Sequence, residues 1–434
     1  MPTKWRPPTP LWAISHGFAT SYDRAMAKTA MKTRTYDVLV VGGGMVGSAV
    51  APILAAAGLD VVLVDREDPA ALVSAPFDGR ASAIAYASHR LLSTTGLWND
   101  MARHAEPIRE IRVSEGRSPF FLHFDHADLG DAPLGFMLEN RHTRAALFMA
   151  AERTAGVEVM PRVAVEGVDR SGARAIATLS DGRTISASLV IAADGVRSAL
   201  RDAAGIRTTR WDYRQTGIIA TVEHERPHRG IAHEHFLPSG PFAILPLQGN
   251  RSSLVWTEKT AEAERIMRLE RTAFDAEMRR RYGDFMGEVS VVGRRWGYPL
   301  RVSLAHQYVA PRLALVGDSA HGLHPLAGQN LNLGYRDTAA LVEIVIEAAR
   351  LGLDIGQVDV LRRYEAWRRL DNISLLAVTD GLNRLFSNDI KPVKLARGLG
   401  LAAVDRLPGV KKFFMAHARG TVGIKPKLLE GQMV

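Results

Sequence analysis

The segment running from Tyr36 to Asp65 most constrains how this chain can fold. Within it, Val38 to Leu59 are 22 residues without a charge, which is long enough to cross a bilayer. Four glycines interrupt the first half of that run, and a second β-branched run, Val61–Val64, follows it. This order predicts a strand, a tight turn, a helix and a parallel strand, whose burial on both faces explains the continuous hydrophobicity.

The glycines have the spacing G-x-G-x-x-G at Gly42, Gly44 and Gly47. In a β-α-β unit the first glycine permits the tight turn, the second lets the backbone approach a pyrophosphate, and the third lets helix and strand pack closely. The helix is expected to begin near Met45 and Val46, where its free N–H groups favour an anion. A dinucleotide site is therefore predicted.

Asp65 ends the second predicted strand, 18 residues after Gly47. A carboxylate there accepts hydrogen bonds from an adenosine ribose and argues against a 2′-phosphate. The motif alone leaves NAD and FAD both open. Two later buried strands also end in an acid, Leu189–Gly195 with Asp194 and Leu313–Asp318. An aspartate at a strand tip suits the hydroxyls of a sugar-like chain.

Three motifs together, GGGMVG, AADGVRS and GDSAHGLHPLAGQNLNLG, resemble the single-component FAD-dependent aromatic hydroxylases of the para-hydroxybenzoate hydroxylase type. Within that group the chain is similar to the ubiquinone-biosynthesis hydroxylases, the UbiH/UbiF/VisC family, from about Tyr36 to Gly420. The resemblance implies an α/β fold, α+β overall. A Rossmann-like FAD-binding domain would carry an inserted antiparallel-sheet substrate domain and a helical C-terminus.

The resemblance also assigns cofactor-binding residues. The three glycines, Met45 and Val46 would hold the pyrophosphate, Asp65 the ribose, and Asp318 the ribityl hydroxyls. No catalytic side chain is assigned, although His324 and Pro325 are expected to border the flavin. The remaining residues expected near FAD are Arg66, Arg80, Asn140, Arg144, Val163 (placed on a strand beside the adenine), Asp194, Gly195, Gly328, Leu331 and Asn332.

One position departs from the family pattern. The resemblance implies Gly-Gln-Gly where this chain has Gly328, Gln329 and Asn330. Asparagine is the residue other than glycine that best tolerates a positive φ. Asn330 is therefore expected to keep the glycine's backbone conformation and to add a polar side chain beside the flavin.

The implied activity is hydroxylation of the ring of a polyprenylated phenol in ubiquinone biosynthesis. NAD(P)H would be the co-substrate, O₂ the oxidant, and a flavin C4a-hydroperoxide the oxygen donor. Two alternatives stay open: a non-catalytic FAD-stabilised subunit of a membrane-associated complex, and another flavoprotein of this fold, such as a halogenase or a prenyl reductase. The W-x-W-x-I motif of flavin halogenases is absent.

The predicted domains are discontinuous. FAD-binding segments are expected at 36–110, 136–205 and 293–345, a substrate domain at 111–135 and 206–292, and C-terminal helices at 346–434. Strands are predicted at 213–223, 231–237, 242–247 and 252–257, and helices at 332–351 and 359–385.

Several other side chains are candidates for particular roles. Phe236, Phe242 and Trp256 are expected to be ordinary core, with an aromatic pocket wall as the alternative. No metal is expected, because no carboxylate-rich motif accompanies the spaced pair His233 and His235. His321 is a candidate for proton transfer or for simple loop hydrogen bonding. The arginines at 362, 363, 368 and 369 are expected to form a solvated helix face.

The formal net charge of +9 is concentrated at the ends, with +5 in residues 1–35 and +7 in residues 391–434, leaving −3 between them. That distribution disfavours a nucleic-acid partner. Residues 1–35 are expected to be a disordered extension or to reflect a mis-assigned start, with Met31 as the true start. The amphipathic, basic segment 394–415 suits a membrane surface or another quinone-biosynthesis protein, and a plain capping helix packed against the body is the alternative. A cytoplasmic enzyme, peripheral on the inner membrane, is expected.

Overall fold

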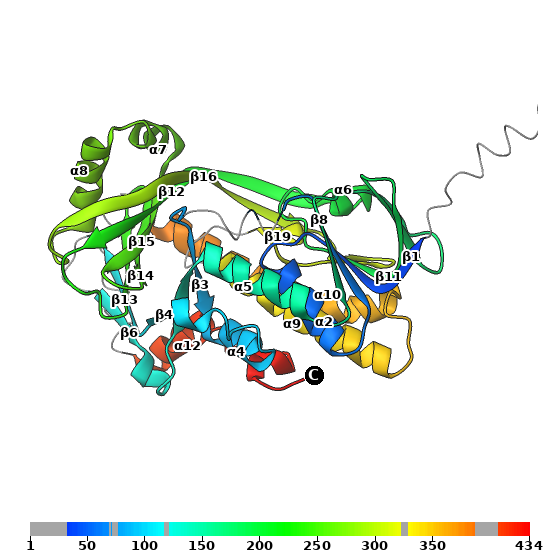
Figure 1. The fold of residues 1–434 in the computed structure, drawn as a ribbon. Helices are drawn as coiled ribbons and strands as arrows, with labels where there is room; N and C mark the ends of the chain where they lie inside the picture. The colour runs from blue at the N-terminus through cyan, green and yellow to red at the C-terminus, as the bar shows by residue number, and fades with distance from the viewer. Residues whose placement is uncertain (1–32, 69–70, 72–76, 117–120, 323–328, 387–406) are drawn as a thin grey trace, which may run out of the picture.

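The computed structural model describes residues 33–68, 71, 77–116, 121–322, 329–386 and 407–434. Within these ranges the chain forms two large sheets, a small third sheet and a set of helices that join them (Figure 1). The extension 1–32 and most of the segment 394–415 lie outside the described residues, so the predictions made for them stay predictions. Among the helices of these ranges, none combines the length and apolarity needed to span a bilayer.

The first sheet contains the predicted β-α-β unit. Strand β1 (Arg34–Val41) pairs in parallel with β2 (Val61–Asp65) on one side and with β11 (Thr184–Ala192) on the other. Helix α2 (Gly47–Ala56) connects β1 to β2 and is almost entirely buried. The further strands are β8 (Val157–Pro161), β9 (Val165–Asp169), β10 (Ala175–Leu179), β17 (Val309–Ala310) and β18 (Leu313–Leu315).

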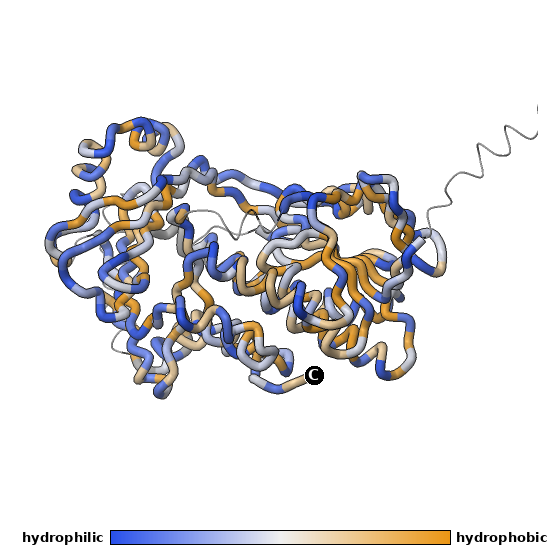
Figure 2. Tube along the Cα trace, viewed as in Figure 1, coloured by the Kyte–Doolittle hydropathy of each residue, from blue (hydrophilic) through white to orange (hydrophobic). Residues whose placement is uncertain are grey.

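Burial on both faces accounts for the uncharged run that opened the sequence. Helices α2, α5 (Asn140–Arg153) and α9 (Gln329–Arg350) lie along the first sheet, and their side chains form one hydrophobic cluster with its strands. Figure 2 shows the most hydrophobic residues gathered in these strands. The run is thus the interior of a parallel sheet, as predicted.

The second sheet has eight strands in the order β19, β16, β12, β15, β14, β13, β5, β6. All four strands predicted between residues 213 and 257 are present, with somewhat longer bounds for three of them. Helices α7 (Thr260–Met267) and α8 (Arg271–Tyr282) pack on the sheet. The strands are β5 (Glu110–Glu115), β6 (Phe121–Asp125), β12 (Thr208–His224), β13 (Ile231–Leu237), β14 (Gly240–Leu247), β15 (Arg251–Lys259), β16 (Val289–Ala305) and β19 (His321–Gly322).

Two long strands link the sheets. β12 and β16 each have 17 residues and pair along most of their length. They form a ribbon that reaches from α7 and α8 to the first sheet (Figure 1). The segments predicted as a substrate domain therefore supply most of the second sheet, while β16 and β19 also enter it from the segment 293–345 predicted to bind FAD.

A small sheet lies between the two large ones. It consists of β3 (Ala81–Ala85), β7 (Gly135–Glu139) and β4 (Glu106–Ile108). Helix α4 (Tyr86–Thr94) follows β3 directly. The short helical segments are η2 (Ala102–His104), η3 (His126–Leu129), α6 (Ala199–Ala203), η4 (Gly317–Ser319) and η6 (Lys427–Glu430).

Helices α10 and α12 complete the described chain beyond α9. Both long helices were predicted: α9 is observed at Gln329–Arg350 and α10 at Val358–Phe386. Helix α12 (Pro408–Ala418) packs Met415 against the small sheet. The prediction that Arg368 belongs to a solvated face is wrong: its side chain is only 3% exposed, because it pairs with a buried carboxylate on α9.

Candidate active site

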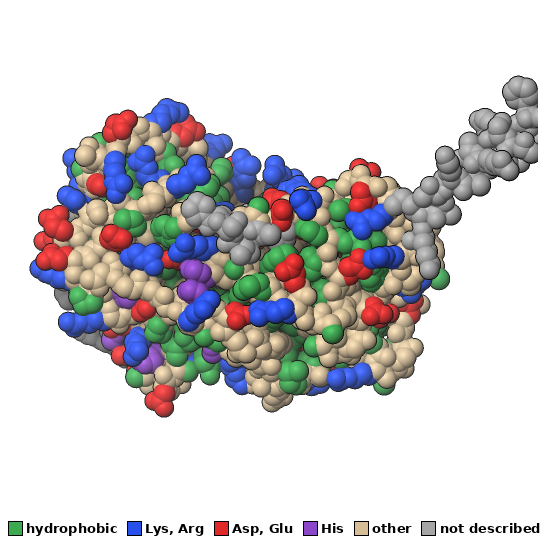
Figure 3. All heavy atoms as spheres, in the orientation of Figure 1, with side chains coloured by type: hydrophobic (Ala, Val, Ile, Leu, Met, Phe, Trp, Pro, Cys, Tyr) green, Lys and Arg blue, Asp and Glu red, His purple; other side chains and the backbone are tan. Residues whose placement is uncertain are grey.

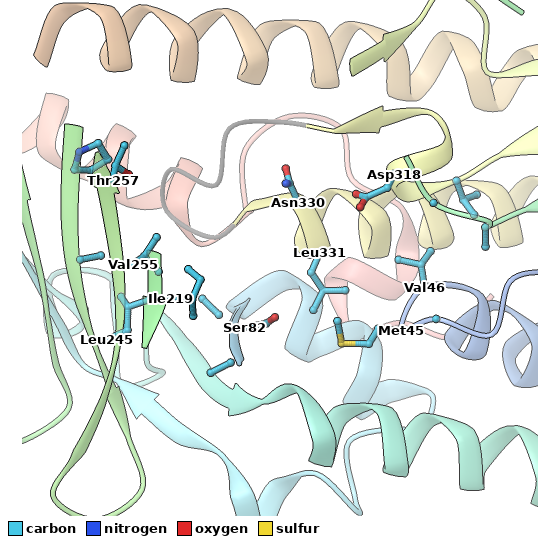
Figure 4. A pocket seen from close by; sticks show the side chains of 18 of the residues that line it. Met45, Val46, Ser82, Ile219, Leu245, Val255, Thr257, Asp318, Asn330 and Leu331 are labelled. Carbon is cyan, nitrogen blue, oxygen red and sulfur yellow. The ribbon is translucent and has the colours of Figure 1, made fainter. Parts of the chain in front are cut away.

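A cavity of about 420 Å³ opens between the first sheet and the second. One wall comes from the loop after β1, the ends of β11 and β18, and the start of α9. The opposite wall comes from β12 to β15, and β3 lies between the two (Figure 4). The lining residues are Gly44, Met45, Val46, Ala81, Ser82, Ala83, Ala193, Gly195, Ile219, Glu234, Pro241, Ala243, Leu245, Val255, Thr257, Val316, Asp318, Asn330 and Leu331.

The glycine loop has the geometry that its spacing predicts. Gly42 has φ +108°, and a Cβ there would meet the carbonyl group of Ala193. At Gly47 a Cβ would collide with the Gly42 carbonyl oxygen, since the helix starts against the turn. A Cβ on Gly44, in contrast, would meet nothing within 4 Å, although Gly44 lines the cavity. Gly42 and Gly47 therefore allow the tight turn and the close start of the helix, while the backbone at Gly44 borders open space in the cavity.

Helix α2 begins at this loop, and its cap residue, Val46, provides no side-chain hydrogen bond. The first N–H groups of a helix need an acceptor from outside it, and together with the helix dipole they favour an anion. An open cradle and an uncapped helix N-terminus suit the pyrophosphate of FAD.

Asp65 lies at the end of β2, directly beside the glycine loop. Its carboxylate accepts the N–H of Gly43 and, at 2.7 Å, the N–H of Glu67. Arg66 is exposed. Val163 is buried next to them and donates its N–H to the Asp65 carbonyl oxygen at 2.9 Å. Its expected place on a strand is wrong, because β8 ends at Pro161 and the chain turns at the next residue.

The second predicted acid, Asp194, follows β11 on the same side of the sheet. One carboxylate oxygen accepts the N–H of Leu200 at 3.3 Å, while Oδ1 is buried without a hydrogen-bond partner among the described residues. Gly195 has φ +81° and lines the cavity. An orphaned buried oxygen of this kind indicates a polar group missing from the protein alone.

Asp318 is the third strand-end acid and points into the cavity from η4 (Figure 4). Its side chain is open to the cavity space rather than packed. Although the residue is exposed to the cavity, desolvation by the protein atoms around it raises the pKa of this carboxyl, and nearby His321 partly opposes the rise. A carboxyl group at this depth is suited to hydrogen-bonding the hydroxyls of a ribityl chain.

The arginines predicted near the flavin lie around the cavity without lining it. Arg80 pairs with Asp78 and places its guanidinium 4.9 Å from the Trp296 ring centre. Burial and the charge of Arg80 lower the pKa of Arg144, while the nearby carboxylates of Asp78 and Glu67 oppose the shift. Asn140, at the start of α5, accepts the hydroxyl of Ser82 at 2.7 Å.

The start of α9 contributes Asn330 and Leu331 to the cavity wall. The expectation of a positive φ at Asn330 is wrong, because this residue lies in the first turn of α9 and has a helical backbone. Asn332 is buried, and its side-chain amide joins α9 to β3 through the Ala85 N–H at 2.8 Å and the Ala83 carbonyl at 3.0 Å. His324, Pro325 and Gly328 lie outside the described residues.

A buried charge network supports this wall, and no sequence pattern indicated it. His321 and Asp337 are both fully buried and hydrogen-bonded to each other. Arg368 on α10 donates to the other Asp337 oxygen at 2.8 Å. Burial alone would raise the pKa of Asp337, but His321 and Arg368 outweigh it and lower the pKa to about 2. The carboxylate also accepts the Gly317 N–H at 3.1 Å, which fixes the segment carrying Asp318.

The structure confirms ordinary core, and not a pocket wall, for the three aromatic candidates. Phe242 and Trp256 are buried in the cluster that packs against α8, on the sheet face away from the cavity. Phe236 is buried without lining the cavity. Because side chains alternate between the faces of a strand, the cavity instead receives the intervening, mainly aliphatic residues.

Glu234 is a site residue that sequence reasoning missed. It lies on β13, lines the cavity, and has a pKa raised to about 7 by burial. The neighbouring His233 and His235 stack on each other with ring centres 5.9 Å apart. Within the described ranges, no group of three or more His, Asp or Glu side chains could hold a metal ion.

The comparisons with known proteins agree with this geometry. A family model described as "FAD binding domain" matches residues 35–371. Ubiquinone hydroxylase UbiL of Rhodospirillum rubrum is 50% identical over 92% of this chain and 93% of its own length. The 3-demethoxyubiquinol 3-hydroxylase of Escherichia coli is 35% identical over 90% of this chain and its full length.

Solved structures show the same fold at lower identity. The p-nitrophenol 4-monooxygenase PnpA of Pseudomonas putida superposes with a TM-score of 0.75 at 20% identity, covering 90% of this chain and 100% of that one. A variant of Klebsiella pneumoniae HpxO, complexed with FAD, has a TM-score of 0.70 at 18% identity and covers 89% and 99% of the two chains.

Proposed function

Because this chain belongs to the family of FAD-dependent ubiquinone hydroxylases, we propose that it hydroxylates the aromatic ring of a polyprenylated phenol on the route to ubiquinone. FAD is the cofactor, NAD(P)H the reductant and O₂ the source of oxygen. The observation that carries the proposal is the 50% identity to UbiL along nearly the whole of both chains. A cavity that joins a dinucleotide loop to an apolar sheet face supports it.

In this proposal the polar half of the cavity holds FAD. Gly44 and the start of α2 bind the pyrophosphate, Asp65 and Val163 lie at the adenosine end, and Asp318 binds the ribityl hydroxyls. Asp194 presents its free oxygen to the cofactor or to an ordered water. The other residues assigned to FAD are Gly42, Met45, Val46, Gly47, Arg66, Arg80, Asn140, Arg144, Gly195, Pro325, Gly328, Leu331 and Asn332.

FAD, when bound and reduced by NAD(P)H, supplies the activation of O₂ that aromatic hydroxylation needs. The chain itself positions the ring and excludes water. Ile219, Leu245 and Val255 form an apolar wall that suits an aromatic ring with a prenyl substituent. On the opposite wall, Asp337 accepts the Gly317 N–H and thereby fixes the segment that carries Asp318.

The test is reconstitution with FAD followed by turnover. With NAD(P)H, O₂ and a short-chain prenylphenol, we expect a product heavier by one oxygen atom, which mass spectrometry detects and which carries label from ¹⁸O₂. In the source organism, deletion should cause a quinone precursor to accumulate. An intact quinone pool in a deletion strain with no second hydroxylase would refute the proposal, as would a protein that cannot take up FAD.

The alternative of a non-catalytic FAD-stabilised subunit is not favoured. It rested on Asn330 alone, and this residue is part of a regular helix that lines the cavity. Substrate-stimulated NAD(P)H consumption without hydroxylated product would reopen it. Replacement of Asn330 by Gly then checks whether the asparagine causes the uncoupling.

The site of action is proposed to be a membrane surface, where a prenylated substrate resides. Helix α12 supports this proposal with an exposed apolar stripe of Val410 and Phe414, continued by Leu407 just before the helix, which are 39%, 37% and 53% exposed. Exposed Lys412 adds positive charge to the same helix. An exposed apolar stripe next to a cation suits the interface of an anionic bilayer.

A further inference from the structure

Glu234 occupies a row of residues that crosses the second sheet. Strand pairing aligns Val113, Glu234, Ala243, Val255, Ile219 and Trp296 on neighbouring strands. Directly paired residues face the same side of a sheet, and four members of this row line the cavity. Glu234 is therefore a carboxyl group in an otherwise uncharged row, on the wall opposite Gly44 and Asp318.

The surroundings leave this carboxyl without an obvious structural task. Among the described residues, no hydrogen bond or ion pair of the Glu234 side chain is found, and desolvation is the cause of its raised pKa. Arg112 and His233 are register partners on neighbouring strands. Their side chains and that of His235 face the opposite side of the sheet from Glu234. On α10, Asp380 accepts the hydroxyl of Tyr213. Across the cavity, Asp318 is the titratable group that faces it.

A desolvated carboxyl without a partner is costly, so its presence in the wall of a ligand cavity indicates a use. The apolar wall fits the ring and prenyl chain of the proposed substrate, which carries one kind of polar group, the phenolic hydroxyl. Resting on the proposed function, we propose that Glu234 is a catalytic residue that hydrogen-bonds this hydroxyl and takes its proton during ring hydroxylation.

The proton balance of the step is closed. As the O–H bond breaks, its proton passes to the Glu234 carboxylate, and the electron pair enters the ring, whose nucleophilic carbon forms the new C–O bond. When the resulting dienone loses its ring proton and becomes aromatic, the Glu234 carboxylic acid returns a proton to the carbonyl oxygen. O₂ is the oxidant: its O–O bond breaks as the C–O bond forms, and the two electrons from NAD(P)H reduce the second oxygen atom to water. Glu234 ends in its starting state.

The experiment compares FAD-loaded wild type with Glu234→Gln and Glu234→Asp. Steady-state hydroxylation of the short-chain prenylphenol is followed between about pH 5 and 9. Glu258→Gln is the matched control, because Glu258 is a buried carboxylate on the next strand but one, bonded to Trp256 and Arg281 and not lining the cavity. Infrared titration of the carboxylic acid C=O band, without substrate, reads the ionisation of Glu234 independently of turnover.

We expect kcat/KM of the wild type to rise with pH through a midpoint near 7, because the carboxylate is the proton acceptor. Glu234→Gln should lose that limb and about 100-fold in kcat, with KM changed by less than about threefold. Glu234→Asp should recover part of the rate, and Glu258→Gln should keep the wild-type profile. The infrared band titrating near pH 7 should vanish in Glu234→Gln.

Two results would overturn the assignment: an unchanged pH profile with kcat within about threefold of wild type in Glu234→Gln, or no infrared band lost in that variant. If Glu234→Gln fails to fold, Glu234→Asp decides by the same profile. A wild type that binds FAD but hydroxylates no phenol would instead refute the proposed function, and the infrared titration would still report on Glu234.

Discussion

Asp337 stays ionised although no part of it reaches solvent. Its carboxylate is held by His321, Arg368 and the Gly317 N–H, and it links α9 to α10 and to the segment of Asp318. Removing one member of a buried ion pair costs more than the pair contributes, since the other charge remains buried without compensation. The network is therefore a point where one substitution affects both stability and the cofactor site.

We predict that Asp337→Asn lowers the free energy of unfolding by about 3–5 kcal/mol, because Arg368 then stays buried without its counter-charge. Chemical denaturation measures this, and FAD retention should fall in parallel. Asp371→Asn is the control: Asp371 also pairs with Arg368 but is 32% exposed, so its loss should cost at most about 1 kcal/mol. Equal costs for the two variants would contradict the argument.

The same network makes the free energy of unfolding depend on pH in the acid range. The native pKa of Asp337 is lowered to about 2 from its ordinary 3.8. Its stabilising contribution is thus complete above the unfolded value and is lost as the pH falls through the native one. Wild type should lose stability between about pH 4 and 2 more steeply than Asp337→Asn, as denaturation midpoints at successive pH values will show.

Glu234 gives the opposite sign. Its native pKa of about 7 lies above the ordinary 4.5, so the folded state binds the proton more tightly than the unfolded chain does. The stability it contributes is complete below pH 4.5 and declines until pH 7, by at most about 3 kcal/mol. Glu234→Gln should therefore melt higher than wild type at about pH 8, with the difference shrinking toward about pH 5.

Sequence patterns predicted the residues whose roles depend on local backbone. The glycine spacing predicted the turn at Gly42 because φ and close packing are decided within a few residues. Glu234 and Asp337 were not predictable in the same way, since their environments come from strands and helices far apart in the chain. Asn330 was misjudged because helix α9 begins one residue earlier, which imposes a helical φ.

At the scale of elements, the loop between β1 and α2 allows the most direct test of the proposed cofactor contact. A Cβ at Gly44 touches nothing within 4 Å, so Gly44→Ala should fold normally. It should nevertheless weaken FAD binding by at least about tenfold, or about 1.4 kcal/mol, because the methyl group occupies the pyrophosphate space.

The control for Gly44→Ala is Gly167→Ala, on strand β9 and equally free of contacts. FAD titration followed by flavin fluorescence gives the affinities, and the melting temperatures of the apoproteins show whether folding is intact. If both variants bind FAD as wild type does, the pyrophosphate does not lie over Gly44.

Element types and bounds were largely predictable, and side-chain directions were not. Helices α9 and α10 and strands β12 to β15 followed from their periodicity and the turn residues between them. For Phe242 and Trp256 the sequence left both core and pocket wall open, because alternation along a strand assigns two faces without saying which one meets the cavity. Helices α7 and α8 decide this by covering the aromatic face.

On the scale of the whole molecule, the net charge of each sequence segment does not show how charged side chains are distributed over the surface. Figure 3 shows Lys and Arg side chains gathered over α7, α8 and the β12–β16 ribbon. Many of these arginines pair with glutamates, such as Arg265 with Glu262 and Arg281 with Glu277. The near-neutral middle of the sequence is therefore a mosaic of paired charges.

We predict that replacing both Val410 and Phe414 by Glu lowers binding to anionic liposomes by about tenfold or more, because two apolar anchors are lost. Flotation measures the bound fraction. Ile176→Glu is the control, since Ile176 is 38% exposed on strand β10 of the first sheet. Deleting 391–434 is a poorer test, because Leu428 and Leu429 belong to the core. Unchanged flotation of the double variant would assign α12 no membrane role.

The cavity has walls from both large sheets, and this has a consequence for the order of events during biosynthesis. The β-α-β unit is local and can form soon after it leaves the ribosome, but β1 must wait for β11, and the opposite wall must wait for β12 to β15. Closing such distant pairings is slow. A nascent chain therefore completes the cofactor cavity only near the end of folding. The supply of flavin should then affect how much mature enzyme is obtained, and it should not change how fast the β-α-β unit forms.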